Sequence, residues 1–359
     1  MAIAAAALLA GLLLSGAFTG LMQRWSVRHG FVDLPGGHKA HAAPVALGGG
    51  VAVTAAVVLP VLGGMLAARL LHHTAADWLP EALARHLGGI VAKTHVALGL
   101  AAAASALCWL GLHDDRRPLG PGLKLLVETA IAASLVVGLD LRLLSHLGWW
   151  PSTVLSILWI ITLINSLNFL DNMDGLAGGV TLIAAGVFGA MALSAGQVFV
   201  PTLCWLLVGA VAGFLPYNLP PARIYLGDAG SLVLGLLLAV LTILTTFADA
   251  SQGHRPIGVV APLVVMAVPL YDTASVVFLR WRLGWPIWKS DRRHFSHRLV
   301  RSGMSRRKAV AVIWLATLVT ALPALLLPRA GWLLAGGIAL QTLLVVALVA
   351  MLEGGRTED

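Results

Sequence analysis

The sequence predicts an all-α, polytopic integral membrane protein with about eleven transmembrane helices. Two observations predict this fold class. Of the 359 residues, 58% are hydrophobic and 11% are charged, and the mean hydropathy is +0.88. Soluble domains carry about 25% charged residues, so this chain has too few charges to cover a soluble surface. Apolar runs that can cross a bilayer core, at roughly 20 residues each, recur along the whole chain.

Eleven apolar stretches follow one another, and we expect them to form a single membrane-embedded domain over residues 1–359. The first stretch has no basic segment before it and no convincing cleavage site after it. It is therefore expected to be a helix and not a cleaved signal. The predicted spans cover residues 2–22, 47–71, 95–112, 122–140, 152–169, 175–194, 198–216, 230–247, 257–279, 308–327 and 331–352.

Lys and Arg are divided unequally between the two sets of loops and adjoining helix ends, with 18 in one set and 6 in the other. Because positive residues collect on the cytoplasmic side, the first set is predicted to be cytoplasmic. The N-terminus is then outside, the C-terminus is inside, and the protein lies in the inner or plasma membrane. The net charge of +8 indicates anionic lipid and not nucleic acid as its partner. The predicted cytoplasmic loops that carry the site cover about 23–46, 113–122, 168–175, 217–229 and 280–307.

Many of the acidic residues gather at the predicted cytoplasmic side. Asp272 lies within the ninth span, towards its cytoplasmic end, and charges at membrane depth are usually functional. Any one of these acids alone is more often a helix cap or a solvated carboxylate. Several on one face, with basic residues nearby, indicate a functional site. The loop acids are Asp33, Asp114, Asp115, Asp171, Asp174, Asp228 and Asp291.

One apolar span carries a polar stripe. Asn165, Asn168 and Asp171 recur every three residues, so they lie close together on one helix face. Asp174 follows and leads into the next helix. An apolar run seldom carries such a stripe unless it faces a site, although a hydrogen-bonded helix interface is the alternative.

Paired carboxylates point to a divalent cation. Asp114 and Asp115 are adjacent and repel each other unless a cation lies beside them, and Lys124 starts the next helix. Asp228 starts the eighth span and can either cap that helix or bind metal. Carboxylates without a cysteine or histidine cluster favour Mg²⁺, with Mn²⁺ as the alternative, over zinc.

Two loops carry residue types that bind phosphate. Glycines at the start of the second span offer backbone N–H groups at a helix N-terminus. His and Arg side chains in the last loop are suited to phosphate oxygens. The residues concerned are Lys39, His41, Gly48 and Gly49 in the first loop and Arg292, His294, His297 and Arg298 in the last.

As a set, these motifs resemble the polyprenyl-phosphate N-acetylhexosamine-1-phosphate transferase superfamily, which is glycosyltransferase family 4. Its branches include the WecA/TagO-like enzymes and the MraY translocases, and the resemblance covers nearly the whole chain. The matching motifs are Asp33-x-Pro35…Lys39-x-His41, Asp114-Asp115…Lys124, Asn165-x-x-Asn168-x-x-Asp171-x-x-Asp174, Gly227-Asp228-x-Gly230-Ser231 and His294-x-x-His297.

The resemblance implies a reaction and its partners. A polyprenyl phosphate, such as undecaprenyl phosphate, attacks a UDP-N-acetylhexosamine, giving a polyprenyl-diphospho-sugar and UMP in the first membrane step of a cell-envelope glycan pathway. The Asp291-Arg-x-His294 run resembles the WecA/TagO-like branch and favours N-acetylglucosamine. The resemblance also implies a Mg²⁺-dependent phosphotransferase of the EC 2.7.8 class, and a homodimer as its oligomeric state.

The resemblance also assigns roles to residues. Asp228 is the expected direct Mg²⁺ ligand, with Asp114, Asp115 and Asp171 as further metal residues. The binding residues are expected to be Lys39, His41, Gly48, Gly49, Asn165, Asn168, Arg292 and Arg298. The catalytic set is expected to be Asp114, Asp115, Lys124, Asp171, Asp174, His294 and His297.

A CDP-alcohol phosphotransferase is disfavoured because its compact acidic motif on one helix pair is not evident, and a non-catalytic lipid-binding or scaffold protein would not need the acid and His set. Two further alternatives remain. The first is an MraY-like phospho-MurNAc-pentapeptide transferase, although the triple-His stretch of that branch is absent. The second is a membrane transporter with intramembrane acids, although transporters tend to place such acids near mid-membrane and to show internal repeats.

Overall fold

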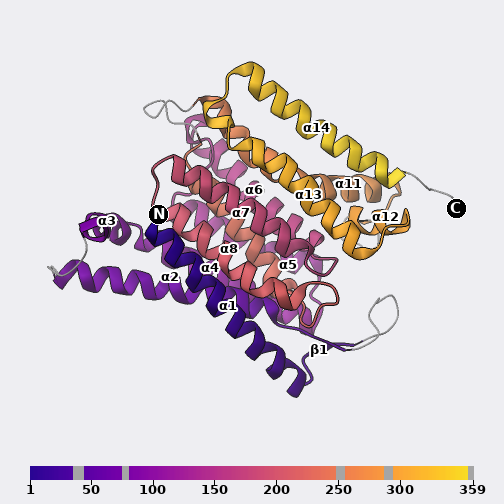
Figure 1. The fold of residues 1–359 in the computed structure, drawn as a ribbon, viewed down its shortest axis with the longest axis horizontal. Coiled ribbons are helices and arrows are strands. Elements are labelled where there is room, and N and C mark those ends of the chain that lie inside the picture. Colours follow the sequence, from indigo (N-terminus) through magenta and orange to yellow (C-terminus); the bar gives the residue numbers. More distant parts are fainter. Residues whose placement is uncertain (35–43, 75–80, 248–254, 287–293, 355–359) are drawn as a thin grey trace.

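Helices make up nearly all of the computed structural model, which describes residues 1–34, 44–74, 81–247, 255–286 and 294–354 (Figure 1). Short 3-10 helices η1 (Ser145–Leu147), η3 (Pro256–Val260) and η4 (Leu327–Arg329) lie in the connections. The α-helices are α1 (Ala2–Arg28), α2 (Gly49–Thr74), α3 (Glu81–Ala92), α4 (Thr94–Arg116), α5 (Pro121–Gly138), α6 (Trp149–Leu170), α7 (Leu176–Ser194), α8 (Phe199–Asn218), α9 (Asp228–Leu244), α10 (Ala261–Val265), α11 (Ala267–Arg282), α12 (Phe295–Arg301), α13 (Arg306–Ala324) and α14 (Trp332–Gly354).

The all-α, multi-span architecture predicted from hydropathy is confirmed. Within the described ranges, nine helices are long and apolar enough to cross a membrane, or ten if one bent pair counts as a span. The eighth predicted span corresponds to α9, which has only 17 residues. At 1.5 Å per residue this is about 25 Å, short of a hydrocarbon core of about 30 Å. Eleven spans, and the orientation, therefore stay predictions.

The ninth predicted span is a broken helix. Its two parts, Pro256–Val265 and Ala267–Arg282, meet at an angle of 63°. Pro269 explains the break, because proline has no N–H to donate to the carbonyl of Val265 and its ring clashes with that carbonyl. The bend turns α11 and the Asp272 that it carries relative to the rest of the span.

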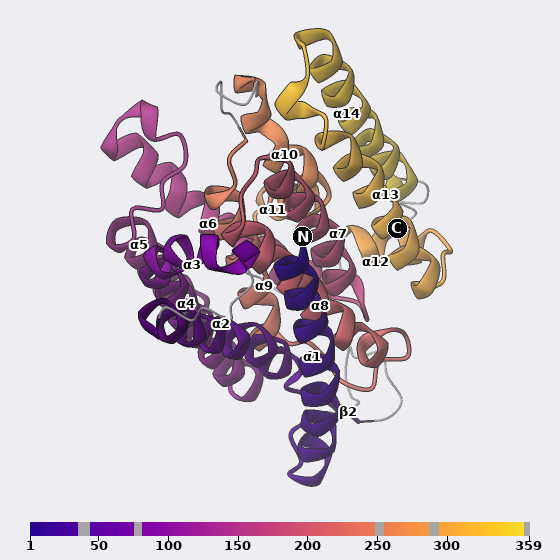
Figure 2. The ribbon, with the colours of Figure 1, turned by 60° about the vertical axis from the view of Figure 1, so that its left-hand side comes forward.

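Helix α9 lies in the interior of the bundle (Figure 2). Every residue from Ala229 to Thr242 is buried, and α9 packs against α2, α4, α6 and α7. A helix that is apolar on all sides is stable when other helices surround it. Its first residue, Asp228, is therefore fixed by the packing of the whole bundle.

Two loop regions have secondary structure that the sequence analysis did not predict. Strands β1 (Val32–Asp33) and β2 (Val45–Ala46) pair antiparallel, and Ala46 also forms a parallel bridge with Ile224. This bridge ties the first loop to the segment just before α9. Helix α3, which has an apolar face, follows α2 and precedes α4 along the chain.

Candidate active site

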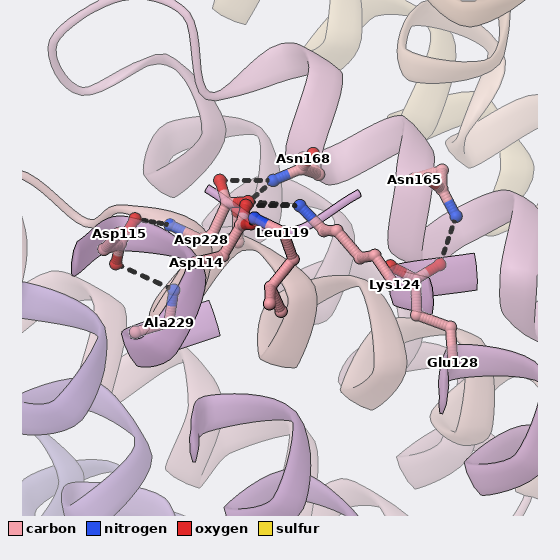
Figure 3. Close-up of polar contacts among 10 residues, drawn as sticks. Asp114, Asp115, Leu119, Lys124, Glu128, Asn165, Asn168, Asp228 and Ala229 are labelled. Atoms are coloured by element: carbon pink, nitrogen blue, oxygen red, sulfur yellow. Dashed lines mark hydrogen bonds and ion pairs between the residues drawn. The ribbon is translucent and has the colours of Figure 1, made fainter. Parts of the chain in front are cut away.

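Polar side chains from the ends of four helices lie together, and Figure 3 shows their contacts. Helix α4 ends at Arg116, α5 begins at Pro121, α6 ends at Leu170 and α9 begins at Asp228. The polar side chains on these ends come from the segments that the Lys and Arg distribution assigns to one side of the membrane. The site therefore lies at a helix-end surface and not at the middle of the bundle.

Lys124 joins two aspartates from different helices. Its Nζ lies 3.3 Å from Oδ2 of Asp114 and also donates to Oδ2 of Asp228. The other carboxylate oxygen of Asp114 accepts the Leu119 N–H at 2.6 Å. The side chains of Lys124, Asp114 and Asp228 are 15%, 18% and 27% exposed, so a ligand can still reach the cluster. The structure thus brings together three residues that the sequence analysis selected.

Asn168 fixes the other side of Asp228. Its Nδ2 donates to Oδ1 of Asp228 at 2.8 Å and to Oγ of Ser231 at 3.0 Å. With Lys124 on Oδ2 and Asn168 on Oδ1, Asp228 is held by α5 and α6 at once (Figure 3). The predicted polar face of α6 is therefore directed at the start of α9.

Asn165 has a partner that the sequence analysis missed. Its Nδ2 donates to Oε2 of Glu128 at 2.6 Å, and Glu128 is fully buried. Glu128 lies four residues after Lys124, so the two share one face of α5. A carboxylate within an apolar run, one turn from a predicted catalytic lysine, is the signal that could have identified it. Asn165 is thus engaged by the protein in this structure.

Asp115 has a different role from its neighbour. Its Oδ1 accepts the N–H of Asp228 at 2.9 Å and its Oδ2 accepts the N–H of Ala229 at 3.3 Å. The first N–H groups of a helix have no intrahelical partner, and a carboxylate there also favours the helix dipole. Asp115 therefore fixes the N-terminus of α9, whereas the sequence analysis expected a metal ligand.

Asp171 ends α6 among other acids. Desolvation raises the pKa of its carboxyl well above the usual range, and the negative charges of Asp228, Asp115 and Asp174 raise it further. A backbone hydrogen bond from Gly227 acts in the opposite direction. These carboxylates therefore lie close enough to disfavour one another's charge, and a bound cation would reverse this effect.

Asp174 and Asn218 tie the loop after α6 to the loop before α9. Asp174 Oδ2 accepts the N–H of Ala222 at 3.0 Å. Asn218 accepts the N–H of Gly175 and donates to the carbonyl of Ile224, both at 2.9 Å. The structure gives Asp174 this loop-fixing contact, and its catalytic role stays a prediction.

The glycines at the start of α2 allow a close backbone contact. The N–H of Gly49 donates to the carbonyl of Tyr225 at 3.0 Å, so this N–H is not available to a phosphate and the prediction for Gly49 is wrong on this point. Its Cβ would lie 2.6 Å from that same oxygen. Gly48 has a φ of +94°, and its Cβ would lie 2.5 Å from Cε of Met22. Both positions require glycine for backbone geometry.

The predicted phosphate-binding residues of the last loop lie partly within the described chain. His294 is buried and contacts Phe169, with ring centroids 5.6 Å apart. His297 and Arg298 lie on α12, and Arg298 donates to Oγ of Ser275 at 2.7 Å. Phe169 follows Asn168 in sequence, which places His294 beside the end of α6. Lys39, His41, Asp291 and Arg292 lie outside the described residues.

A metal ion would need ligands beyond those that the protein presents in this state. In the part of the chain that the structure describes, no group of three or more His, Cys, Asp or Glu side chains could hold a metal ion. Mg²⁺ usually takes only one or two carboxylates and completes its shell with water and substrate phosphates. The all-oxygen donor set, with several acids around Lys124, fits such a metal.

Replacing Gly111 by alanine tests how closely α4 must approach α9. A Cβ at Gly111 would lie 2.3 Å from the carbonyl carbon of Asp228 and 2.4 Å from the nitrogen of Ala229. We expect Gly111→Ala to cost about 1–3 kcal/mol of stability by overpacking, seen as a lower Tm, and to lower activity because Asp115 and Asp228 move apart. Gly186→Ala is the matched control, since nothing lies within 4 Å of that Cβ. An unchanged Tm and activity in Gly111→Ala would contradict the packing described.

Fold and site together define a class: a polytopic, all-helical membrane protein with a lysine, aspartate and asparagine site where four helix ends meet. The chain belongs to glycosyl transferase family 4. The model of that family matches residues 97–246, which run from α4 to just beyond α9 and include Asp114, Lys124, Asn168 and Asp228.

The chain is also similar to named proteins over most of its length. It is 30% identical over 323 residues to the probable undecaprenyl-phosphate N-acetylglucosaminyl 1-phosphate transferase of Bacillus subtilis, covering 87% of this chain and 81% of that protein. It is 30% identical to the decaprenyl-phosphate N-acetylglucosaminephosphotransferase of Mycolicibacterium smegmatis, covering 94% and 86%. It is 28% identical to the undecaprenyl-phosphate alpha-N-acetylglucosaminyl 1-phosphate transferase of Yersinia pestis, covering 86% and 80%.

Proposed function

We propose that this protein transfers N-acetylglucosamine 1-phosphate from UDP-N-acetylglucosamine to a polyprenyl phosphate, releasing UMP. The observation that carries the proposal is the cluster of Asp114, Lys124, Asn168 and Asp228 at one end of a membrane bundle. The names of the relatives described above specify undecaprenyl or decaprenyl phosphate and N-acetylglucosamine phosphate transfer. These names support this donor over the MraY-type donor.

In the proposed reaction, an oxygen of the lipid phosphate attacks the phosphorus that carries the sugar. A phosphorus–oxygen bond forms to the lipid phosphate, and the bond from that phosphorus to the bridging oxygen of the diphosphate breaks. UMP leaves with the electron pair. A phosphate monoester has a second pKa of about 6, so the lipid phosphate is mostly ionised at neutral pH and needs little help from a base.

The residues of this chain supply charge and position. Asp228, with Asp114 and Asp171, would hold Mg²⁺, or Mn²⁺ in its place. When bound, such an ion would neutralise negative charge on the diphosphate and on the leaving UMP. Lys124 offers a positive charge to phosphate oxygens from α5, and His294 offers a ring nitrogen from the start of α12. Asn168 keeps Asp228 oriented, because it holds one of its oxygens.

We propose that the site faces the cytoplasm of the inner or plasma membrane. The unequal distribution of Lys and Arg supports this orientation, since 18 of 24 fall in the sequence segments predicted for the side that carries the site. A soluble UDP-sugar and a lipid phosphate can meet there. The acids of the cluster lie at helix ends, which argues against the transporter alternative.

The test is UMP release by purified protein in detergent, with UDP-N-acetylglucosamine, UDP-N-acetylgalactosamine and UDP-MurNAc-pentapeptide offered separately. We expect release only with polyprenyl phosphate present, fastest with UDP-N-acetylglucosamine, lost on chelation with EDTA and restored by Mg²⁺. UMP release that persists in EDTA would contradict the proposed dependence on a divalent metal ion. Preference for the pentapeptide donor would favour the MraY-type reaction.

A further inference from the structure

A buried aspartate lies behind the last loop. Asp272 on α11 is completely buried. Its Oδ2 lies 3.0 Å from Nδ1 of His294, and its Oδ1 accepts the N–H of Phe295 at 2.8 Å. Both carboxylate oxygens are thus used to hold the first residues of α12, and His294 is 7% exposed.

The contact determines which nitrogen of His294 carries hydrogen. An ionised carboxylate only accepts hydrogen bonds, so Nδ1 must donate. Nε2 is then the nitrogen left for a ligand, as an acceptor in neutral imidazole and as a donor in imidazolium. As a donor, Nε2 suits a phosphate oxygen.

A row of side chains connects this pair to the end of α6. The ring of Phe169 on α6 lies 5.6 Å from the His294 ring, and the guanidinium of Arg280 lies 5.4 Å from the centre of the Phe169 ring. Arg280 is buried and comes from the same helix as Asp272. Helix α11 therefore holds His294 directly and the end of α6 through Phe169.

We propose that Asp272 is a positioning residue for the transfer reaction, which keeps His294 oriented with Nε2 free at the end of α6. The proposal rests on the proposed function for its substrate. Asp272 itself need not touch the substrate, since both its oxygens are engaged. It lies within the expected ninth span, and membrane depth is a costly place for an acid without a role.

An asparagine in place of Asp272 cannot reproduce both contacts. If the amide oxygen of the new side chain keeps the Phe295 N–H, its amide nitrogen faces Nδ1 of His294. Nδ1 must then become an acceptor, and the hydrogen moves to Nε2. Asp272→Asn therefore preserves size but removes the negative charge beside Nδ1, so His294 can present an Nε2–H to a ligand only as neutral imidazole.

The test is a double-mutant cycle of Asp272→Asn and His294→Ala, measured as kcat/KM for UMP release. We expect each single change to cost about 10- to 100-fold, the range for losing the partner that orients a functional imidazole. The double variant should be no slower than the slower single one, because both act on one group. If Asp272→Asn acted only by loosening the structure, the fold-loss in kcat/KM of the double variant would be the product of the two single losses. That result would overturn the proposal.

Thr273→Val is the matched control. Thr273 is the next residue on α11, and its hydroxyl donates to Oγ of Ser166 on α6 at 2.9 Å. We expect its activity to stay within about twofold of the wild type. Asp272→Asn within the same range, while His294→Ala is impaired, would also overturn the proposal.

A cycle of melting temperatures keeps this proposal separate from the proposed function. If the wild type releases no UMP from any donor, the proposed function fails. The contact between Asp272 and His294 is then tested by Tm alone. A double variant that loses less Tm than the sum of the two single losses would support the contact, and a loss equal to that sum would refute it. If Asp272→Asn does not fold, His294→Asn replaces it, because asparagine keeps an amide donor for Asp272. It should melt near the wild type yet be as inactive as His294→Ala, and a Tm as low as that of His294→Ala would contradict the contact.

Discussion

Asp228→Asn is expected to lower the rate of transfer by about 10³-fold. The variant would lose several kcal/mol of charge stabilisation in the transition state, and about 1.4 kcal/mol corresponds to each factor of ten in rate. Asparagine has nearly the same shape and can still accept the hydrogen bond from Asn168 and start α9. The substitution removes the negative charge and also the oxygen that accepts from Lys124, because asparagine has one amide oxygen where aspartate has two. We therefore expect a folded, inactive protein in which the rate of UMP release, and not Tm, carries the effect.

Asp140→Asn is the control for this change. Asp140 lies at the other end of the bundle, its side chain is 74% exposed, and its φ of 55° is one that asparagine tolerates. It should keep wild-type activity. Transfer by Asp228→Asn at a rate close to that of Asp140→Asn would remove Asp228 from the centre of the mechanism.

Lys124→Met is expected to have the second-largest effect. Its Nζ bonds both Asp114 and Asp228, and removing one donor to a developing phosphate charge costs about 10²–10³-fold in kcat. Without the lysine, the two carboxylates lose their shared counter-charge. A divalent ion then no longer competes with Nζ, so we expect metal affinity to rise while transfer falls.

Binding of Mn²⁺ alone, followed by electron paramagnetic resonance of the free ion, measures the affinity without substrate. Lys93→Met, an exposed position just before α4 at the other end of the bundle, is the control and should change neither quantity. If Lys124→Met binds Mn²⁺ more weakly than the wild type, Lys124 supports the metal site. That result would contradict the competition between Nζ and the metal ion for the two carboxylates.

Hydropathy was enough to predict the multi-span helical fold, because bilayer thickness imposes a length that can be read locally. It missed α3, whose 12 residues lie between longer apolar runs, and it could not show that Pro269 breaks the ninth span. The position of α9 at the centre depends on contacts with five other helices, and no local pattern contains those.

For the site, residue type predicted well which side chains gather and less well what each one does. Asp114 and Asp115 are neighbours in sequence, yet one bonds Lys124 and the other holds the first N–H groups of α9, 113 residues away. The buried Glu128 partner of Asn165, and the Asp272 partner of His294, are likewise set by helix packing. Gly49 carries a backbone contact that only the fold reveals.

The most direct measurement follows the phosphorus itself. UDP-N-acetylglucosamine with radioactive phosphorus in the phosphate next to the sugar is incubated with polyprenyl phosphate, Mg²⁺ and the wild-type protein or Asp228→Asn. We expect the label to appear in the lipid fraction, the released UMP to be unlabelled, and Asp228→Asn to leave the label on the UDP-sugar. Label recovered in released nucleotide, with unlabelled sugar on the lipid, would contradict phospho-sugar transfer.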